Sequence, residues 1–259
     1  MLELFRADLH VHTCLSPCGS LEMGPRAIIS KAADRALDVI GISDHNSCGN
    51  AAAVMKAVGG MRLKVLPGME VTSREEVHIL ALFEGIDEAF RLQQIVYDRL
   101  PGVNDENAFG LQVIVNEDEE VLGFDEHLLA GATELSVEEI VDLIHAIGGA
   151  AIASHVDRLA FGIVGQLGFI PDGLELDAVE LSPIISLAEM RGQFPQEARR
   201  CLVRSSDAHW LKDIGAVWTA FWLKEPSLAE MKKAFRGAEG REVAPSDVPI
   251  DCGGYAART

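Results

Sequence analysis

The sequence predicts a single α/β domain, built as a barrel in which strands alternate with helices. Its 259 residues match the usual size of one such barrel. Short runs rich in Val, Ile and Leu recur along the chain, and helix-like patterns separate several of them. Hydrophobic residues make up 48% of the sequence, which is enough to bury a sizeable core.

Eight short apolar runs predict the strands of this barrel. They cover residues 4–10, 37–44, 63–70, 77–83, 149–155, 177–182, 200–209 and 216–223. Strands that alternate with helices form a largely parallel sheet whose faces are covered. We therefore expect a largely parallel sheet that closes into one barrel.

Two segments between these strands show clear helix patterns, residues 24–37 and 136–149. Pro25 suits the first turn of the earlier helix, since proline has no backbone N–H to leave unpaired there. Ser136 and Glu139 fit a capping box, and Gly148 with Gly149 supplies the end of the later helix.

The least regular part of the chain is residues 84–135. Within it, the acidic stretch "NEDEE" (116–120) predicts the turn of a hairpin. We interpret 84–135 as an insertion or lid between barrel elements, inside a single domain that spans residues 1–259.

Charge, hydropathy and cysteine spacing limit the functions that are open to the chain. A net charge of -18 argues against a broad surface for duplex nucleic acid, because such binding depends on Lys and Arg. No apolar run is long enough for a membrane span, and "MLELFRADLH" lacks the pattern of a signal peptide. The five cysteines form no regular framework. We expect a cytoplasmic protein with reduced thiols and no membrane contact.

The motif "DLHVHT" places two histidines where they share one side of a strand. Residues i and i+2 of a strand point the same way, so His10 and His12 can face one site. The spacing returns in Asp207 and His209 of "RSSDAH".

Between these two pairs, further polar residues stand at the ends of predicted strands. They are Asp44, His45, Glu70, His78 and His155. The carboxyl ends of barrel strands meet at one face, where barrel enzymes build their sites. We expect these side chains to converge there. A lone histidine at a strand end is usually structural, but the repetition favours a shared site.

This set of ligands predicts a metal centre. Imidazole and carboxylate groups suit Zn²⁺, Mn²⁺ and Fe²⁺, and a carboxylate such as Glu70 can bridge two ions. Bridged metals activate a water molecule and hold both the attacked and the leaving oxygens of a phosphoryl group. We therefore predict hydrolysis of a phosphate ester by metal-activated hydroxide. His127 and His145 do not end a strand, and we place both outside the site.

Six stretches of the sequence resemble the successive motifs of a known family. They are "DLHVHT", "SDHN", "PGMEV", "EVHIL", "ASHVDR" and "SSDAH". Together they resemble the polymerase-and-histidinol-phosphatase (PHP) family over about residues 7–210. The resemblance implies a metal-dependent phosphoesterase with a distorted (β/α)₇ TIM-like barrel. The "LSPCG" loop and residues 84–135 resemble a stand-alone bacterial branch of this family.

The resemblance also implies a multinuclear centre of two or three divalent ions, Zn, Mn or Fe. The ligands implied for the first metal are His10, His12, Glu70 and Asp207. Those implied for the second are Glu70, His78 and His155, and those for the third are His45 and His209.

The third metal would need one more ligand from the loop after His12, where relatives have Asp or His. This sequence has neither there, and Cys18 stands at a matching spacing. A thiolate would favour Zn²⁺ or Fe²⁺ over Mn²⁺. The alternative is that Cys18 only packs in a turn, and Glu22 is a weaker substitute.

Three further residues have supporting roles in this interpretation. Asp8 and Asp44 adjoin the expected metal histidines and can orient them, because bound imidazoles usually donate their other N–H to an acceptor. Asp44 could instead assist proton transfer. Arg158 resembles the phosphate-contacting arginine of the family, and a guanidinium suits bidentate phosphate binding. A surface salt bridge is the alternative for Arg158.

Several alternatives remain open at this point. The substrate we expect is a small phosphate monoester, diester or nucleotide, with no extended nucleic-acid surface. The rival functions are a nuclease for short nucleic acids, an amidohydrolase-type hydrolase and a non-catalytic metal-binding module. The native metal, the physiological substrate and the oligomeric state are not determined by the sequence.

Overall fold

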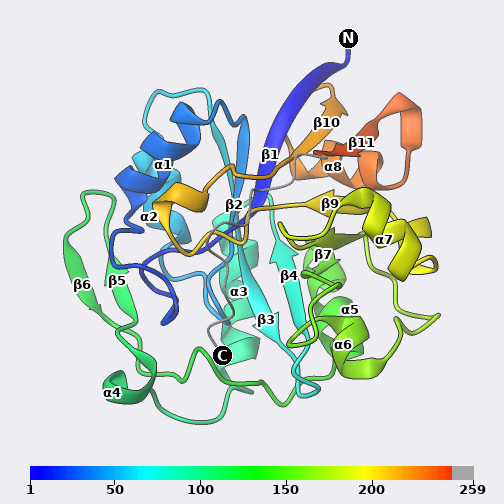
Figure 1. Cartoon of the computed structure of the whole chain (residues 1–259). Coiled ribbons are helices and arrows are strands. Elements are labelled where there is room, and N and C mark those ends of the chain that lie inside the picture. The colour runs from blue at the N-terminus through cyan, green and yellow to red at the C-terminus, as the bar shows by residue number, and fades with distance from the viewer. Residues whose placement is uncertain (247–259) are drawn as a thin grey trace.

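Nine strands form one mixed sheet, which curls into a nearly closed barrel (Figure 1). The computed structural model describes residues 1–246. The order of strands across the sheet is β11-β10-β1-β2-β3-β4-β7-β8-β9. These strands are β1 (Glu3–Val11), β2 (Val39–Ile42), β3 (Lys64–Thr72), β4 (His78–Leu82), β7 (Ala150–Ala153), β8 (Ala178–Leu181), β9 (Leu202–Arg204), β10 (Thr219–Leu223) and β11 (Glu242–Pro245). A separate hairpin consists of β5 (Val113–Val115) and β6 (Val121–Phe124).

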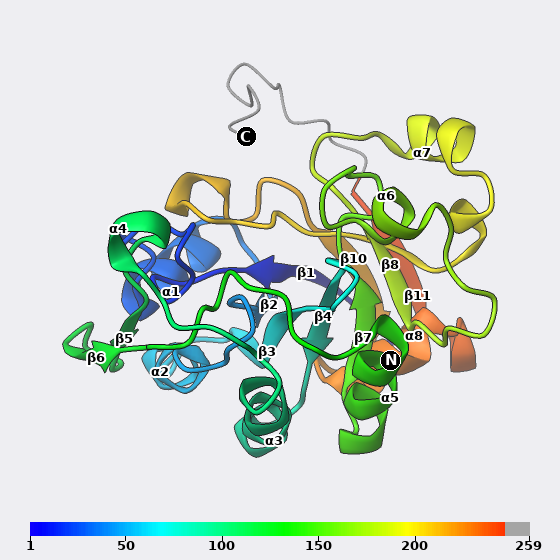
Figure 2. The same ribbon diagram turned by 90° about the horizontal axis from the view of Figure 1, so that it is seen from below.

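Helices surround this sheet, except that α4 lies away from it, on the side of the β5–β6 hairpin (Figure 2). They are α1 (Pro25–Asp34), α2 (Ala51–Ala57), α3 (Ile86–Tyr97), α4 (Glu106–Phe109), α5 (Val137–Ile147), α6 (Ile163–Leu167), α7 (Leu187–Gln193) and α8 (Leu228–Phe235). Among residues 1–246, none of these helices has both the length and the apolar character that a membrane span needs.

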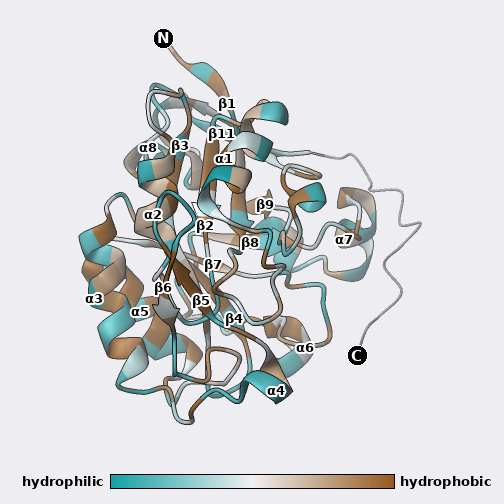
Figure 3. Ribbon diagram, turned by 90° about the vertical axis from the view of Figure 1, so that its left-hand side faces the viewer, coloured by the Kyte–Doolittle hydropathy of each residue, from teal (hydrophilic) through white to brown (hydrophobic). Residues whose placement is uncertain are grey.

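Apolar side chains fill both faces of the sheet, whose strands are mostly brown in Figure 3. In β4, Ile79 and Ala81 join the cluster that packs the sheet against the outer helices. Leu80 and Leu82 join a second cluster, which the strands and α8 enclose. This alternation follows from the two-residue period of a strand. Both faces of β4 are therefore buried.

All eight predicted strands are present, and the two predicted helices form for the expected reasons. Pro25 occupies the first turn of α1. The hydroxyl of Ser136 accepts from the backbone N–H of Glu139 at the start of α5, and the Glu139 carboxylate accepts from the N–H of Ser136. Gly148 ends this helix in the left-handed conformation.

The direction of β4 differs from the prediction of a largely parallel sheet. This strand runs antiparallel to both β3 and β7. Only residues 73–77 join β3 to β4, which is too short for the crossover that a parallel pair requires. His78 opens β4, so the reversal puts it at the same end of the sheet as the carboxyl ends of its neighbours. β10 and β11 are also antiparallel.

The barrel closes where the end of β1 meets the chain beyond β9. Val11 and Ala208 form an isolated parallel bridge. The N–H of His12 donates to the Ala208 carbonyl at 3.0 Å, and the N–H of Ala208 donates to the His10 carbonyl at 3.2 Å. The Thr219 hydroxyl also links β9 and β10, by accepting from the N–H of Arg204 and donating to its carbonyl.

The segment 84–135 has two parts: α3 belongs to the helices around the barrel, and the β5–β6 hairpin lies outside them. α3 packs against β3 and α5. The β5–β6 hairpin stands apart from the main sheet (Figure 1), with its turn at 116–120 as expected. Asn46 holds the end of the segment by donating from Nδ2 to the carbonyls of Leu129 and Gly131, each at 2.8 Å. The proposed insertion is therefore anchored beside the loop after β2.

We predict that Gly68→Ala destabilises the fold. An added Cβ would lie 2.0 Å from the Ala81 carbonyl oxygen of the paired strand β4. We expect the free energy of unfolding to fall by about 1–3 kcal/mol, as is usual for overpacking. Chemical denaturation measures it.

Gly123→Ala is the matched control, because Gly123 also lies in a strand but its added Cβ meets nothing within 4 Å. The control should change stability by less than about 0.5 kcal/mol. Equal stability of the two variants would show that the β3–β4 contact is looser than the structure indicates.

Candidate metal centre

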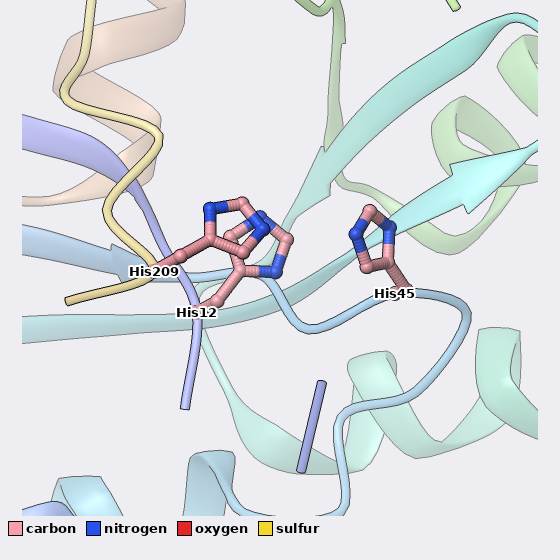
Figure 4. Close-up of side chains that lie close together, drawn as sticks. All are labelled: His12, His45 and His209. Carbon is pink, nitrogen blue, oxygen red and sulfur yellow. The ribbon is translucent and has the colours of Figure 1, made fainter. Parts of the chain in front are cut away.

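Six of the eight histidines converge at the end of the barrel where the strands' carboxyl termini meet. They come from β1 (His10), the chain just after it (His12), the loops that follow β2, β7 and β9 (His45, His155, His209) and the start of β4 (His78). Neighbouring ring centroids lie between 4.0 Å, for His12 and His209, and 6.2 Å, for His10 and His155. Figure 4 shows His12, His45 and His209 close together although they come from three separate loops.

Glu70, near the end of β3, lies at the centre of these rings and is buried. Its Oε1 lies 3.0 Å from His78 Nδ1 and 3.2 Å from His155 Nε2. Its Oε2 lies 3.2 Å from His45 Nδ1. One carboxylate therefore faces histidines from three separate parts of the chain, as the bridging role predicted for it requires.

Asp207 supplies a second carboxylate beside the pair on β1. Its Oδ1 lies 3.2 Å from His12 Nε2 and 3.4 Å from His10 Nε2. Its Oδ2 forms an ion pair with Arg158 Nη1 at 2.7 Å. The parallel bridge between Val11 and Ala208 explains this geometry. The residues that flank Val11 and those that flank Ala208 all point to the same side of the sheet, so His10 and His12 face Asp207.

The far nitrogens of three histidines are held by acceptors, which aims their Nε2 atoms into the cluster. Nδ1 of His10 lies 3.1 Å from both carboxylate oxygens of Glu180, and Nδ1 of His209 lies 2.9 Å from the Asp207 carbonyl. Nδ1 of His12 lies 2.9 Å from the Ser16 hydroxyl. These acceptors favour a proton on Nδ1 and leave the Nε2 lone pairs directed at the centre.

Asp44 lies behind the cluster rather than in it. Its carboxylate accepts from the Ser16 hydroxyl at 2.6 Å and from both the N–H and the hydroxyl of Thr13 at 2.7 Å. The Ser16 hydroxyl donates to Asp44 and contacts Nδ1 of His12, so Asp44 orients the His12 ring through Ser16. Burial raises the pKa of Asp44 against these hydrogen bonds. The contacts indicate a positioning residue.

Two more buried or half-buried aspartates clamp site loops in the same way, each binding the N–H and the hydroxyl of one serine. Asp8 accepts from Ser206 at 2.9 and 2.6 Å, directly before Asp207. Asp157, in the loop that carries His155 and Arg158, accepts from Ser182 at 2.7 and 2.5 Å. Each clamp fixes a loop by two hydrogen bonds to one residue, which pre-orders the ligands.

The cluster shifts the pKa values of its members in opposite directions. Burial opposes charge on His10, but three carboxylates, Glu180 first among them, hold its pKa well above the usual value. Burial and His209 lower the pKa of His12 to about 3. Burial would raise the pKa of Glu70, but His78 and His10 hold it well below its usual range. The lowered pKa of Glu70 favours its ionised form, and the lowered pKa of His12 favours a neutral ring that can act as a metal ligand.

The arrangement of these atoms fits divalent metal ions. Glu70 Oε1 and His78 Nδ1 are buried and 3.0 Å apart, yet neither has a hydrogen-bond partner. Buried polar atoms without partners need an explanation, and an ion between them is one. Three groups of residues bring ligand atoms within 4.8 Å of one another in the described chain. They are His10, His12 and Glu70; His45, Glu70 and His78; and His12, His45 and His209.

A family model for the PHP domain matches residues 8–172, which is more than half of the chain. The chain belongs to the PHP domain family. This confirms the resemblance to the family, of which five of the six motifs lie within the matched residues, and supports a hydrolase that acts on phosphate ester bonds.

Solved structures with a similar fold include an endonuclease and a proposed phosphoesterase. The lesion-specific endonuclease EndoQ from Pyrococcus furiosus aligns with a TM-score of 0.70 at 17% identity, over 93% of this chain and 58% of that chain. PsfC from Pseudomonas syringae aligns at 0.58 with 14% identity, over 95% and 92%. A proposed metal-dependent phosphoesterase from Bifidobacterium adolescentis aligns at 0.52 with 16% identity, over 79% and 87%.

These similarities confirm the α/β barrel of the PHP type. The chain spans only 58% of the endonuclease chain. A structure of endonuclease Q, aligned at 0.66 and 18% identity over 93% of this chain and 58% of that one, holds a 27-mer duplex with an abasic lesion at its active site. This finding pulls against our expectation of no extended nucleic-acid surface in the fold. A search of curated proteins found no significant match.

Within this PHP fold, Cys18 lies beside His209 and outside the three ligand groups. Its side chain is exposed. Burial lowers the pKa of His209, but Asp207 and Cys18 outweigh it and raise the value to about 10. Glu22 lines an open apolar cavity of about 340 Å³ beside the β5–β6 hairpin. Cys18 is thus the nearer of the two to the proposed third site.

The remaining two histidines have partners elsewhere, as expected. His127 lies 2.8 Å from the Asp125 carboxylate and stacks on Tyr97. His145, on α5, lies 2.9 Å from the Asp177 carboxylate. Each is therefore a histidine held by a neighbouring acid.

Two residues that hold the rings of His10 and His12, Glu180 and Ser16, were not predicted from the sequence. Glu180 is fully buried in β8, within the otherwise apolar stretch "AVEL". A carboxylate inside a buried strand needs a partner, and this signal could have identified it. Ser16 carried no comparable signal, because serine is common in loops.

We predict that Glu180→Gln weakens metal binding without unfolding the protein. Glutamine can still accept from His10 Nδ1 but carries no charge, so the imidazole becomes a poorer ligand. We expect metal affinity to fall about 10- to 100-fold, measured by competition with a chelating dye.

The matched control is Asp177→Asn, which alters a carboxylate that holds a histidine outside the cluster. This control should bind metal as the wild type does. If both variants keep full affinity, Glu180 only fills space in β8.

Proposed function

We propose that this PHP-domain chain is a metal-dependent phosphoesterase that hydrolyses a small phosphate ester. One observation carries the proposal: Glu70 lies buried among histidine nitrogens at 3.0–3.4 Å, and its Oε1 forms no hydrogen bond. Imidazole nitrogens crowded around an ionised carboxylate form a donor set that suits Zn²⁺, Mn²⁺ or Fe²⁺.

The nine proposed ligands would share two or three ions. His10, His12, Glu70 and Asp207 would hold the first, and Glu70, His78 and His155 the second. His45, His209 and Cys18 would hold the third. Ions bound here would polarise the phosphoryl group and lower the pKa of a water molecule. His12 belongs to two of the three groups of close ligand atoms, and so does His45. This supports ligands that are shared between neighbouring metal ions.

Arg158 is the residue that we assign to the phosphate. Its guanidinium contacts Asp207 and remains 34% exposed, so it reaches both the cluster and the solvent. A planar guanidinium can bind two phosphate oxygens and stabilise the charge that gathers on them. In the reaction a water oxygen attacks phosphorus, the P–O bond to the ester oxygen breaks, and that oxygen takes up a proton.

Asp44 acts on this chemistry from a distance. Its carboxylate has no exposure and is bound by Thr13 and Ser16. These contacts support a positioning role through Ser16 and His12, and they leave no free oxygen for proton transfer to a substrate.

A nuclease acting on short nucleic acids is the second candidate function. The structural similarity to endonuclease Q favours it. The net charge of -18 favours a small ester over duplex nucleic acid, because phosphate contacts with long duplexes depend on cations.

A substrate panel separates these candidates. Phosphomonoesters, phosphodiesters, nucleotides and short oligonucleotides would each be incubated with the protein and Mn²⁺, Zn²⁺ or Fe²⁺ in turn. We expect release of phosphate or of a phosphorylated product from at least one small ester. Hydrolysis of oligonucleotides alone would favour the nuclease, and stoichiometric metal binding with no hydrolysis would contradict both.

We predict that Glu70→Gln and Asp207→Asn each lower kcat by about 10³-fold or more, because each removes a charge that the metals need. Both should stay folded, which circular dichroism checks. Glu138→Gln, on the exposed side of α5, is the control and should keep full activity. Activity near that of the wild type in either site variant would refute the ligand assignment.

We predict that Cys18→Ser lowers the metal content by up to one ion per chain, with a smaller effect on kcat. A hydroxyl is a poorer ligand than a thiolate for Zn²⁺. Elemental analysis measures the content. Cys201→Ser is the control, since burial raises the pKa of this half-buried thiol to about 12. An unchanged metal count in Cys18→Ser would assign Cys18 to packing.

A further inference from the structure

The turn after β7 presents an aromatic ring at the edge of the metal centre. The ring of Phe161 stacks on His78, with centroids 4.5 Å apart and planes at 17°. His78 is buried, whereas Phe161 remains 40% exposed. One face of the phenyl ring is thus covered by a proposed metal ligand, and Phe161 still keeps two fifths of its surface accessible to solvent.

The backbone holds this ring in a strained position. Phe161 has a φ of 61°, in the left-handed region that non-glycine residues rarely occupy. Its carbonyl accepts from the N–H of His78 at 2.9 Å. A Cβ on the next residue, Gly162, would lie 2.3 Å from the Arg158 carbonyl. The surrounding structure therefore fixes the turn, and strain of this kind is concentrated at functional sites.

We propose that Phe161 is a stacking platform for a nucleobase and determines the specificity of the site for nucleotides. The inference rests on the proposed function, because the same turn carries Arg158, to which we assign the phosphate. An exposed aromatic face attracts the flat surface of a base, and such stacking tolerates any base.

Distance favours a nucleotide over a simple aryl phosphate. A ring stacked on the outer face of Phe161 would lie roughly 9 Å from the His78 ring, given stacking separations of about 4.5 Å. An aryl phosphate joins its ring to phosphorus through a single oxygen, which is too short a link. In a nucleotide a sugar separates the base from the phosphate and supplies the missing length.

Charge favours a base that is already free of a duplex. Phe161 is neutral, and stacking needs no cations, so it can operate in a chain of net charge -18. An unstacked base is available in a free nucleotide and at the end of a single strand. Both present the same chemistry to Phe161.

The test compares substrates that differ only in what the phosphate carries. Wild type, Phe161→Ala, Phe161→Leu and Phe161→Trp would be assayed with adenosine 5′-monophosphate, a short single-stranded oligonucleotide, 4-nitrophenyl phosphate and glycerol phosphate. We expect Phe161→Ala to lower kcat/KM about 10- to 100-fold for a base-containing substrate. The value for glycerol phosphate should change by less than about threefold. Loss with the monophosphate assigns free nucleotides, and loss with the oligonucleotide assigns strand ends.

The other variants separate stacking from mere cover of His78. Phe161→Trp should keep the activity of the wild type on base-containing substrates. Phe161→Leu should lose as much of it as Phe161→Ala does, because leucine covers His78 without an aromatic face. Phe90→Ala is the matched control, a phenylalanine on α3 with 37% exposure, and should leave every substrate unaffected.

A binding measurement provides a readout without turnover. In the Glu70→Gln background, Phe161→Ala should weaken binding of adenosine monophosphate about tenfold or more by calorimetry, and binding of glycerol phosphate by less than threefold.

Three results would overturn the inference: an equal loss with all substrates, full rescue by Phe161→Leu, or a loss confined to 4-nitrophenyl phosphate. Failure of the proposed function looks different, because the wild type would then hydrolyse none of the four substrates. The binding preference for the nucleotide would still decide the role of Phe161 in that case.

Discussion

One pairing of backbone groups, between Val11 and Ala208, brings the candidate centre together. It joins the first strand to the chain that follows the last parallel strand, nearly two hundred residues later. Each partner is flanked on both sides by a proposed ligand, so two hydrogen bonds align His10 and His12 with Asp207 and His209. A parallel bridge keeps this register without any help from the imidazoles. The protein therefore builds the centre from main-chain geometry first, and the charges of the side chains follow from that placement.

The acidic residues around the centre have two roles, because some face the histidine rings and others hold the surrounding loops. Glu70 and Asp207 face the rings and supply the negative charge that a cation needs. Asp8, Asp44 and Asp157 face away and each clamp one serine or threonine through its N–H and its hydroxyl. Burial raises the pKa of Asp8 to about 6 despite its hydrogen bonds. Burying these carboxylates costs free energy, but their hydrogen bonds hold the loops in place and order the proposed metal ligands before any ion binds.

The sequence predicted the strands and the convergence of eight proposed ligands, because both depend on local pattern. A polar residue that ends an apolar run lies at the rim of a barrel whatever the rest of the chain does. The direction of β4 was not predicted, since an apolar run such as "HILAL" looks the same in either orientation. Glu180 was missed because its role depends on His10, which lies 170 residues away. The ring of Phe161 escaped notice for the same reason, as its contact with His78 exists only in the folded chain.

The central place of β1 in the sheet has a consequence for how the chain folds during synthesis. Within the barrel this strand is made before all the others, yet it pairs with β10 and with Ala208, which are made roughly two hundred residues later. Until then β2 is its only partner strand among the described residues. Contacts between such distant positions form slowly, because a long loop must close first. A nascent or truncated chain that ends before Asp207 would thus hold three of the four ligands proposed for the first metal, and the full set could form only after the segment around Ala208 had been made and paired with β1.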